Sequence, residues 1–139
     1  MSSAALYNAE VLGLATSLAD YPMTDDLPLR GSARAVTCGS TIELGLAIDA
    51  AGVITEVGMR AQACAIGQAA AAIFAANVHG KDRRELEVAL AKLEQWLAAG
   101  DLPDWRGVAA IAAARDYPAR HGAILLAWRA ALVALATPG

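Results

Sequence analysis

The sequence has few charged residues and no long uninterrupted hydrophobic run. Lys and Arg together number 11 and Asp and Glu 14 among 139 residues, so the net charge is −3. Phosphate binding depends on Lys and Arg, which are scattered here, so we expect no nucleic-acid partner. A membrane-spanning helix needs about 20 apolar residues. The run 63–78 is shorter and contains Gln68 and Asn77, and the run 122–136 carries Arg129 in its middle, so we expect no membrane segment.

Several familiar motifs are also missing. The chain contains no P-loop, no GxGxxG fingerprint and no nucleophile elbow. No basic stretch precedes an apolar run near the first residue, so we expect no signal peptide and a cytoplasmic location. Cys38 and Cys64 are the two cysteines. In the cytoplasm such residues are more often free or metal-bound than joined in a disulfide.

Alanine dominates what is present. Hydrophobic residues make up 57% of the chain, but 35 of them are alanine, so large apolar side chains are not unusually frequent. This apolar content excludes a disordered chain. The length of 139 residues predicts one domain that covers residues 1–139.

Alternating hydrophobic residues predict a β-hairpin in the first half of the chain. Every second position of 42–48 is apolar (Ile42, Leu44, Leu46 and Ile48), which predicts one buried face. After a turn that ends in Gly52, Val53, Thr55, Val57 and Met59 alternate in the same way with Ile54, Glu56, Gly58 and Arg60. Residues 32–37 are expected to form a third strand at the edge. The preceding stretch 20–31 contains prolines and acidic residues, which is typical of a loop.

Helical spacing appears on both sides of the strands. We expect a modest helix over 4–18 and an alanine-rich helix over 64–78, because apolar residues recur about once per turn. Asp82 and Glu85 form a capping-box pattern at the start of the next helix. A short helix or turn over 107–114 and a final helix that starts near Pro118 complete the order. This order predicts an α+β fold with helices packed on one face of a small three-stranded antiparallel sheet.

The two cysteines are the first candidates for chemistry. Cys38 precedes the first strand of the hairpin and Cys64 begins the alanine-rich helix, so the hairpin returns the chain to the same end of the sheet. A helix N-terminus favours the thiolate of Cys64, and Gly39 lets the backbone approach a bound ion. Thiolates select zinc, copper(I) or iron–sulfur clusters. The simpler alternative is that each cysteine is a small buried hydrophobe.

His121 is the third candidate. It stands at the start of the final helix, and its imidazole suits zinc or iron as a further ligand. The alternative is a half-buried histidine at a helix end without a metal. Trp96, Trp105 and Trp128 are predicted to be packing residues.

The chain resembles a known family at these residues. Between Ala35 and Phe74 it contains Ala-Val-Thr-Cys-Gly-Ser, Ile-Glu-Leu-Gly-Leu-Ala-Ile-Asp, and Arg-Ala-Gln-Ala-Cys-Ala-Ile-Gly-Gln-Ala. This stretch is similar to the U-type iron–sulfur cluster assembly scaffolds IscU, SufU and the N-terminal domain of NifU. The segment from Pro118, Pro-Ala-Arg-His-Gly-Ala-Ile-Leu-Leu-Ala-Trp, is similar to the part of that family which holds its third cysteine. A helical insertion before it resembles the SufU branch.

The resemblance implies roles for individual residues. Cys38 and Cys64 fall on the first two cysteine ligands, and His121 falls where IscU-type members have a histidine. Two positions depart from the family pattern: Ser40 replaces an aspartate ligand, and Gly122 stands in the place of the third cysteine. The implied site therefore has two thiolates and one imidazole, whereas a [2Fe–2S] cluster or a structural zinc ion takes four ligands.

Three alternative functions follow from this family resemblance and its two departures. The first is a non-enzymatic scaffold that binds iron, zinc or a labile Fe–S cluster through Cys38, Cys64 and His121, with a missing ligand from a partner or a second chain in a homodimer. The second is a degenerate paralogue that lost the metal and acts as a binding or regulatory module. The third is a sulfur acceptor, with Cys38 or Cys64 receiving persulfide. A cysteine desulfurase is the implied partner.

Overall fold

The computed structural model describes residues 7–136, and the chain forms a three-stranded sheet with four α-helices and three short 3-10 helices. The order of elements is α1 (Ala9–Ser17), η2 (Leu18–Asp20), β1 (Leu29–Arg34), β2 (Thr41–Ile48), β3 (Ile54–Gln62), α2 (Ala65–Asn77), α3 (Arg83–Ala98), η3 (Val108–Asp116), η4 (Pro118–Arg120) and α4 (His121–Ala136). This is the predicted α+β fold.

The sheet is antiparallel and has the order β1-β2-β3. Leu44, in the central strand, pairs with Gly31 on one side and with Met59 on the other. The β2–β3 turn is held by the Asp49 carboxylate, which accepts hydrogen bonds from the backbone N–H groups of Ala51 and Val53 at 2.9 and 3.0 Å. The predicted hairpin is confirmed, but the predicted alternation is wrong at its turn end. A register shift between Ala47 and Ile48 leaves Ile48 41% exposed, whereas Ile54, which the alternation places on the other face, is fully buried.

The edge strand begins earlier than the predicted range 32–37. Strand β1 starts at Leu29 and ends at Arg34, so its first residues come from the stretch expected to be a loop. The sequence hides this start because Gly31, which faces α4, has no side chain to show the alternation. A Cβ atom on Gly31 would lie 2.2 Å from the carbonyl oxygen of Ala130, so glycine is required for this close approach.

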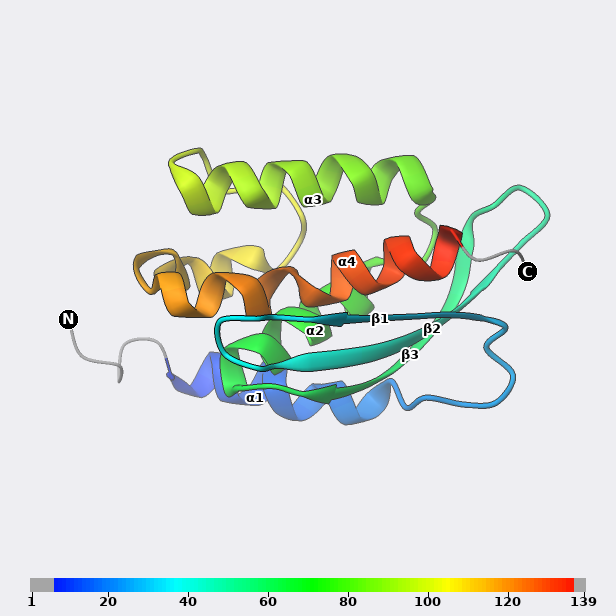
Figure 1. Ribbon diagram of the computed structural model, residues 1–139, viewed down its shortest axis with the longest axis horizontal. Coiled ribbons are helices and arrows are strands. Elements are labelled where there is room, and N and C mark those ends of the chain that lie inside the picture. Colours follow the sequence, from blue (N-terminus) through cyan, green and yellow to red (C-terminus); the bar gives the residue numbers. More distant parts are fainter. Residues whose placement is uncertain (1–6, 137–139) are drawn as a thin grey trace.

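Helices α4 and α2 cover one face of the sheet (Figure 1). Helix α4 packs on β1 and β2, α2 packs beside α4 and against α1, and α3 packs on α4. The opposite face is covered in part by the loop after η2. A Cβ atom on Gly58 would lie 2.3 Å from the carbonyl oxygen of Pro22, so this loop sits directly on the strand.

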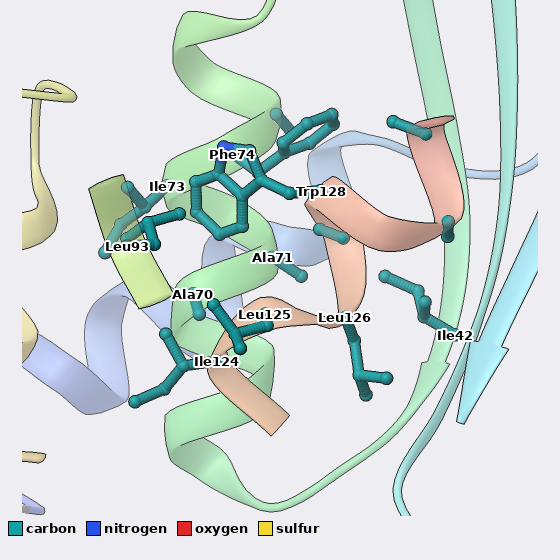
Figure 2. Close-up of a cluster of buried hydrophobic side chains, with 14 of the residues drawn as sticks. Ile42, Ala70, Ala71, Ile73, Phe74, Leu93, Ile124, Leu125, Leu126 and Trp128 are labelled. Atoms are coloured by element: carbon teal, nitrogen blue, oxygen red, sulfur yellow. The ribbon is translucent and has the colours of Figure 1, made fainter. Parts of the chain in front are cut away.

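The core lies between α2, α4 and the sheet (Figure 2). Phe74 and Trp128 meet edge to face with ring centroids 5.3 Å apart, and Trp105 stacks on Phe74 at 5.8 Å. Trp96 is also buried, so the prediction that the three tryptophans are packing residues is confirmed. Alanine-rich α2 buries nine of its residues, which allows its backbone to approach its neighbours closely.

Helix boundaries differ slightly from the predicted ones. Helix α1 spans Ala9–Ser17, and the part of the predicted range 4–18 that precedes Tyr7 lies outside the described residues. The capping box of α3 is confirmed: Asp82 accepts from the Glu85 N–H at 2.9 Å, and Glu85 accepts from the Asp82 N–H at 3.2 Å. The final helical segment begins with a 3-10 turn at Pro118 before α4 itself.

One segment, Pro118–Ala136, is long and apolar enough by length and composition to cross a membrane. Of the residues in its apolar 18-residue stretch, 50% are buried inside the protein, where α4 packs on β1, β2, α2 and α3. The apolar surface of α4 is therefore used by the core of this domain.

Candidate functional site at one end of the sheet

The loop between β1 and β2 carries Cys38 at the surface. Two backbone hydrogen bonds of 2.8 Å close this loop, one from the N–H of Ala35 to the carbonyl of Ser40 and one from the N–H of Gly39 to the carbonyl of Ala35. Gly39 adopts a φ of 74°, a left-handed conformation that favours glycine. The closed loop leaves the Cys38 side chain exposed.

Ser40 lies beneath Cys38 and is 5% exposed. Its hydroxyl oxygen is 3.1 Å from the Cys38 sulfur, where the thiol donates. When the sulfur is a thiolate, the hydroxyl can rotate and donate instead. The Ser40 hydroxyl and then the Ser40 backbone N–H hold the pKa of the Cys38 thiol below its ordinary value; slight burial opposes this shift and the positive charge of Arg120 supports it. The exposure of Cys38 and this lowered pKa both favour an accessible thiolate.

Cys64 occupies a different environment. It is the N-cap residue of α2, with extended backbone angles (φ −64°, ψ 168°), and its side chain makes no capping hydrogen bond. Its carbonyl accepts from the Gln68 N–H at 2.9 Å, which begins the helix. The side chain is half-buried and packs against the hydrophobic core. The predicted position of Cys64 at a helix N-terminus is confirmed.

His121 is the first residue of α4 and is half-buried. Its Nε2 atom lies 2.7 Å from the carbonyl oxygen of Arg115. A carbonyl only accepts hydrogen bonds, so the proton of the neutral ring is assigned to Nε2, and Nδ1 keeps its lone pair. A backbone carbonyl that orients the ring in this way is typical of metal-binding histidines.

The elements that carry these three residues meet at one end of the sheet. A Cβ atom on Gly122, in the first turn of α4, would lie 3.2 Å from the Cβ of Ala35, at the base of the Cys38 loop. A Cβ atom on Gly67, in the first turn of α2, would lie 3.2 Å from the Cβ of Ala123. Figure 1 shows the β1–β2 loop and the starts of α2 and α4 at the same end of the molecule. Small residues therefore let the first turn of α4 touch both cysteine-bearing elements.

The side chains themselves do not form a complete ligand set. Among residues 7–136, no three His, Cys, Asp or Glu side chains are grouped so that they would hold a metal ion. Cys38, Cys64 and His121 are therefore not brought together as one ligand set in this structure, although the elements that carry them meet. Even together they would supply only two thiolates and one imidazole, whereas a [2Fe–2S] cluster takes four ligands. The Ser40 hydroxyl is engaged with Cys38, and Gly122 has no side chain to offer. A bound metal or cluster would need at least one ligand from outside this set.

Sequence reasoning missed two contributors to the environment of Cys38. It treated Ser40 only as a lost ligand, whereas the structure uses its hydroxyl as the hydrogen-bond partner of the thiol. It did not single out Arg120, whose charge acts on Cys38. The available signal in the sequence was that Arg120 immediately precedes the candidate ligand His121.

Comparison with solved structures reveals close similarity over nearly the whole chain. A nitrogen-fixing NifU-like protein (N-terminal) from Brucella abortus has a TM-score of 0.85 and 28% sequence identity, and the match covers 94% of this chain and 92% of that one. A putative iron–sulfur cluster assembly scaffold protein for the SUF system from Fervidobacterium islandicum AW-1 has a TM-score of 0.84 and 19% identity, with 96% and 99% covered. The latter identity supports a shared fold. No curated protein matches the chain.

The family model of the NifU-like N-terminal domain matches residues 16–123, which is well over half of the chain. The matched range includes both cysteines, Ser40 and His121, and the fold agrees with that of the Brucella protein. The U-type scaffold family predicted from the cysteine contexts is therefore confirmed, and this chain belongs to the family of the NifU-like N-terminal domain.

Proposed function

We propose that this chain acts in iron–sulfur cluster assembly as a non-enzymatic scaffold that holds iron or a labile cluster through Cys38, Cys64 and His121, with a further ligand from outside the chain. The observation that carries this proposal is the meeting of the Cys38 loop with the starts of α2 and α4 at one end of the sheet. Zinc is the alternative occupant, because two thiolates and an imidazole also suit zinc.

The exposure of Cys38 supports an external ligand. A cluster that is assembled and then passed on must reach a partner, and an exposed thiolate on a closed loop can bind it at the surface. The cytoplasm is the proposed compartment, and a cysteine desulfurase is the proposed sulfur source. The missing ligand comes from that partner, from a small thiol or from a second copy of the chain in a homodimer.

Reconstitution tests this function. Protein purified without oxygen would be analysed for metal content and then mixed with ferrous iron and sulfide while visible absorption is recorded. We expect charge-transfer bands that are lost in Cys38→Ala and in Cys64→Ala but retained in Thr37→Ala, an exposed neighbour in the same loop. His121→Ala should weaken the bands. An absence of both metal and bands in the unmodified protein would contradict the scaffold function.

A second candidate function is sulfur acceptance by Cys38, favoured by its hydrogen bond to Ser40. In this reaction the Cys38 thiolate attacks the outer sulfur of a persulfide on the desulfurase cysteine. A new S–S bond forms at Cys38, the S–S bond on the desulfurase breaks, and its cysteine leaves as a thiolate. The transfer involves no net oxidation or reduction.

Sulfur labelling distinguishes this second function. With a desulfurase and isotopically labelled cysteine, we expect label on the chain that is lost in Cys38→Ala and kept in Cys64→Ala. Equal labelling of both variants would contradict a specific acceptor role for Cys38. If a desulfurase still binds the double variant Cys38→Ala with Cys64→Ala, and no metal or label is found in the unmodified protein, the chain is instead a partner-binding or regulatory module.

A further inference from the structure

A second surface feature lies away from the cysteines, in a groove between α3 and the loop before η3. The groove has a volume of about 480 Å³. Four cations line it: Lys81, Arg84, Lys92 and Arg106. The loop side is fixed in place because the Asn77 side chain donates to the Arg106 carbonyl at 2.9 Å.

The cations of this groove are concentrated relative to the rest of the chain. The whole protein has 11 basic residues and a net charge of −3, yet four basic residues line this one groove. Ion pairs between side chains of residues 7–136 join Arg60 to Glu43 and Arg129 to Glu94, and neither includes a groove cation. Two carboxylates, Glu85 and Asp104, also line the groove, but Glu85 is occupied by the capping box of α3.

The floor of the groove argues against a nucleotide base as the ligand. Trp105 is 8% exposed, stacks on Phe74, and has the Lys81 ammonium 4.9 Å from its ring centroid. It therefore has no free ring face on which a base would stack. Val88, in contrast, lines the groove and is 47% exposed, so an apolar side chain can be covered there.

We propose that this groove, which we call the α3 groove, docks an acidic segment of a partner protein. Its carboxylates would pair with Arg84, Lys92 and Arg106, and an apolar side chain among them would cover Val88. This proposal does not depend on cluster binding, because the groove contains neither cysteine nor His121.

The test uses a synthetic peptide rich in glutamate with a central leucine, and the same peptide with glutamine in place of glutamate. Binding would be followed by NMR chemical shifts of backbone amides in the full chain. We expect the glutamate peptide to shift amides of α3 and of residues 104–106, with weaker binding at high salt. Arg84→Glu should weaken binding roughly fivefold, since one favourable charge pair becomes a repulsive one.

Arg83→Glu provides the matched control. Arg83 precedes Arg84 in the same first turn of α3 and is exposed, but it does not line the groove. The two variants change the net charge equally. Equal weakening by both, equal binding of the glutamine peptide, or an absence of shifts at the groove would overturn the proposal. It would also be overturned if duplex DNA bound more tightly than the peptide and lost affinity in Arg84→Glu.

Discussion

Cys38 and Cys64 lie on elements that meet at the same end of the sheet, but their surroundings differ. Cys38 is exposed on a closed loop and shares a hydrogen bond with buried Ser40. Cys64 is half-buried, begins α2 and packs against the core. A thiol on the loop is available to partners at little cost to the fold, whereas the second thiol is also part of the packing. The two cysteines thus differ in accessibility and in packing: Cys38 is open to solvent and Cys64 contributes to the core.

The largest effect is expected from restoring the two family ligands that Ser40 and Gly122 replace. The double variant Ser40→Asp with Gly122→Cys should tighten zinc binding roughly a hundredfold, because it adds a carboxylate and a thiolate to a site that otherwise offers fewer than the four ligands that zinc takes. Competition with a coloured chelator measures this affinity. The double variant Ser40→Asp with Ala123→Cys places the new thiol at the adjacent position instead, and the Ala123 side chain faces α2.

A matched control for this restoration is Ser32→Asp with Gly13→Cys. Neither position belongs to the candidate site: Ser32 is exposed on β1, and a Cβ atom on Gly13 would meet no atom within 4 Å. The control adds the same side chains to the surface without completing a ligand set. If it tightened zinc binding as much as the restored site, the placement of Cys38, Cys64 and His121 would have no special role.

Alkylation should separate the two thiols next. In native protein at neutral pH, we expect iodoacetamide to modify Cys38 about tenfold faster than Cys64, because Cys38 is exposed and its thiolate is favoured. Mass spectrometry of peptides measures both rates. In denaturant the two rates should converge. Faster modification of Cys64 in the native state would reverse the assignment of the reactive position.

Substitution should affect folding stability more at Cys64 than at Cys38, which is the reverse of the order expected for alkylation. Cys64→Ser places a hydroxyl against the core and should lower the free energy of unfolding by about 1 kcal/mol. Cys38→Ser changes an exposed side chain and should stay within about 0.5 kcal/mol. Urea unfolding followed by circular dichroism measures both. Equal losses would show that the loop thiol is also structural.

The smallest expected effect concerns the pH dependence of Cys38. The Ser40 hydroxyl lowers the pKa of this thiol, so the thiolate persists to lower pH than in a free cysteine. Ser40→Ala should therefore raise that pKa and move the alkylation profile to higher pH, with slower modification at neutral pH and little change at strongly alkaline pH. Thr37→Ala, in the same loop, is the control and should leave the profile in place. A shift to lower pH in Ser40→Ala would contradict the assigned hydrogen bond.

Much of the fold could be predicted because its signals are local. The alternation of Ile42, Leu44 and Leu46 in β2 and the capping box of α3 each depend on neighbouring residues, and the structure confirms them. The alternation fails at Ile48 and Ile54, where a register shift reverses which side chain is buried. The start of β1 at Leu29 was missed because it depends on contact with α4 through Gly31. Pairing with β2 and packing on α4 stabilise that edge strand, and neither contact leaves a periodic pattern in its own residues.

The candidate site divides in the same way. The sequence by itself determined the fold class, the family, and the placement of Cys38 on a loop and Cys64 at a helix start, because these follow from local patterns and cysteine contexts. Only the tertiary structure decided that Ser40 is the buried partner of Cys38, that the Arg115 carbonyl orients His121, and that the α3 groove gathers four cations. The tertiary contacts that place these groups, between the Cys38 loop, α4, α3 and the loop before η3, join segments far apart in the chain, and no local pattern specifies how such segments pack.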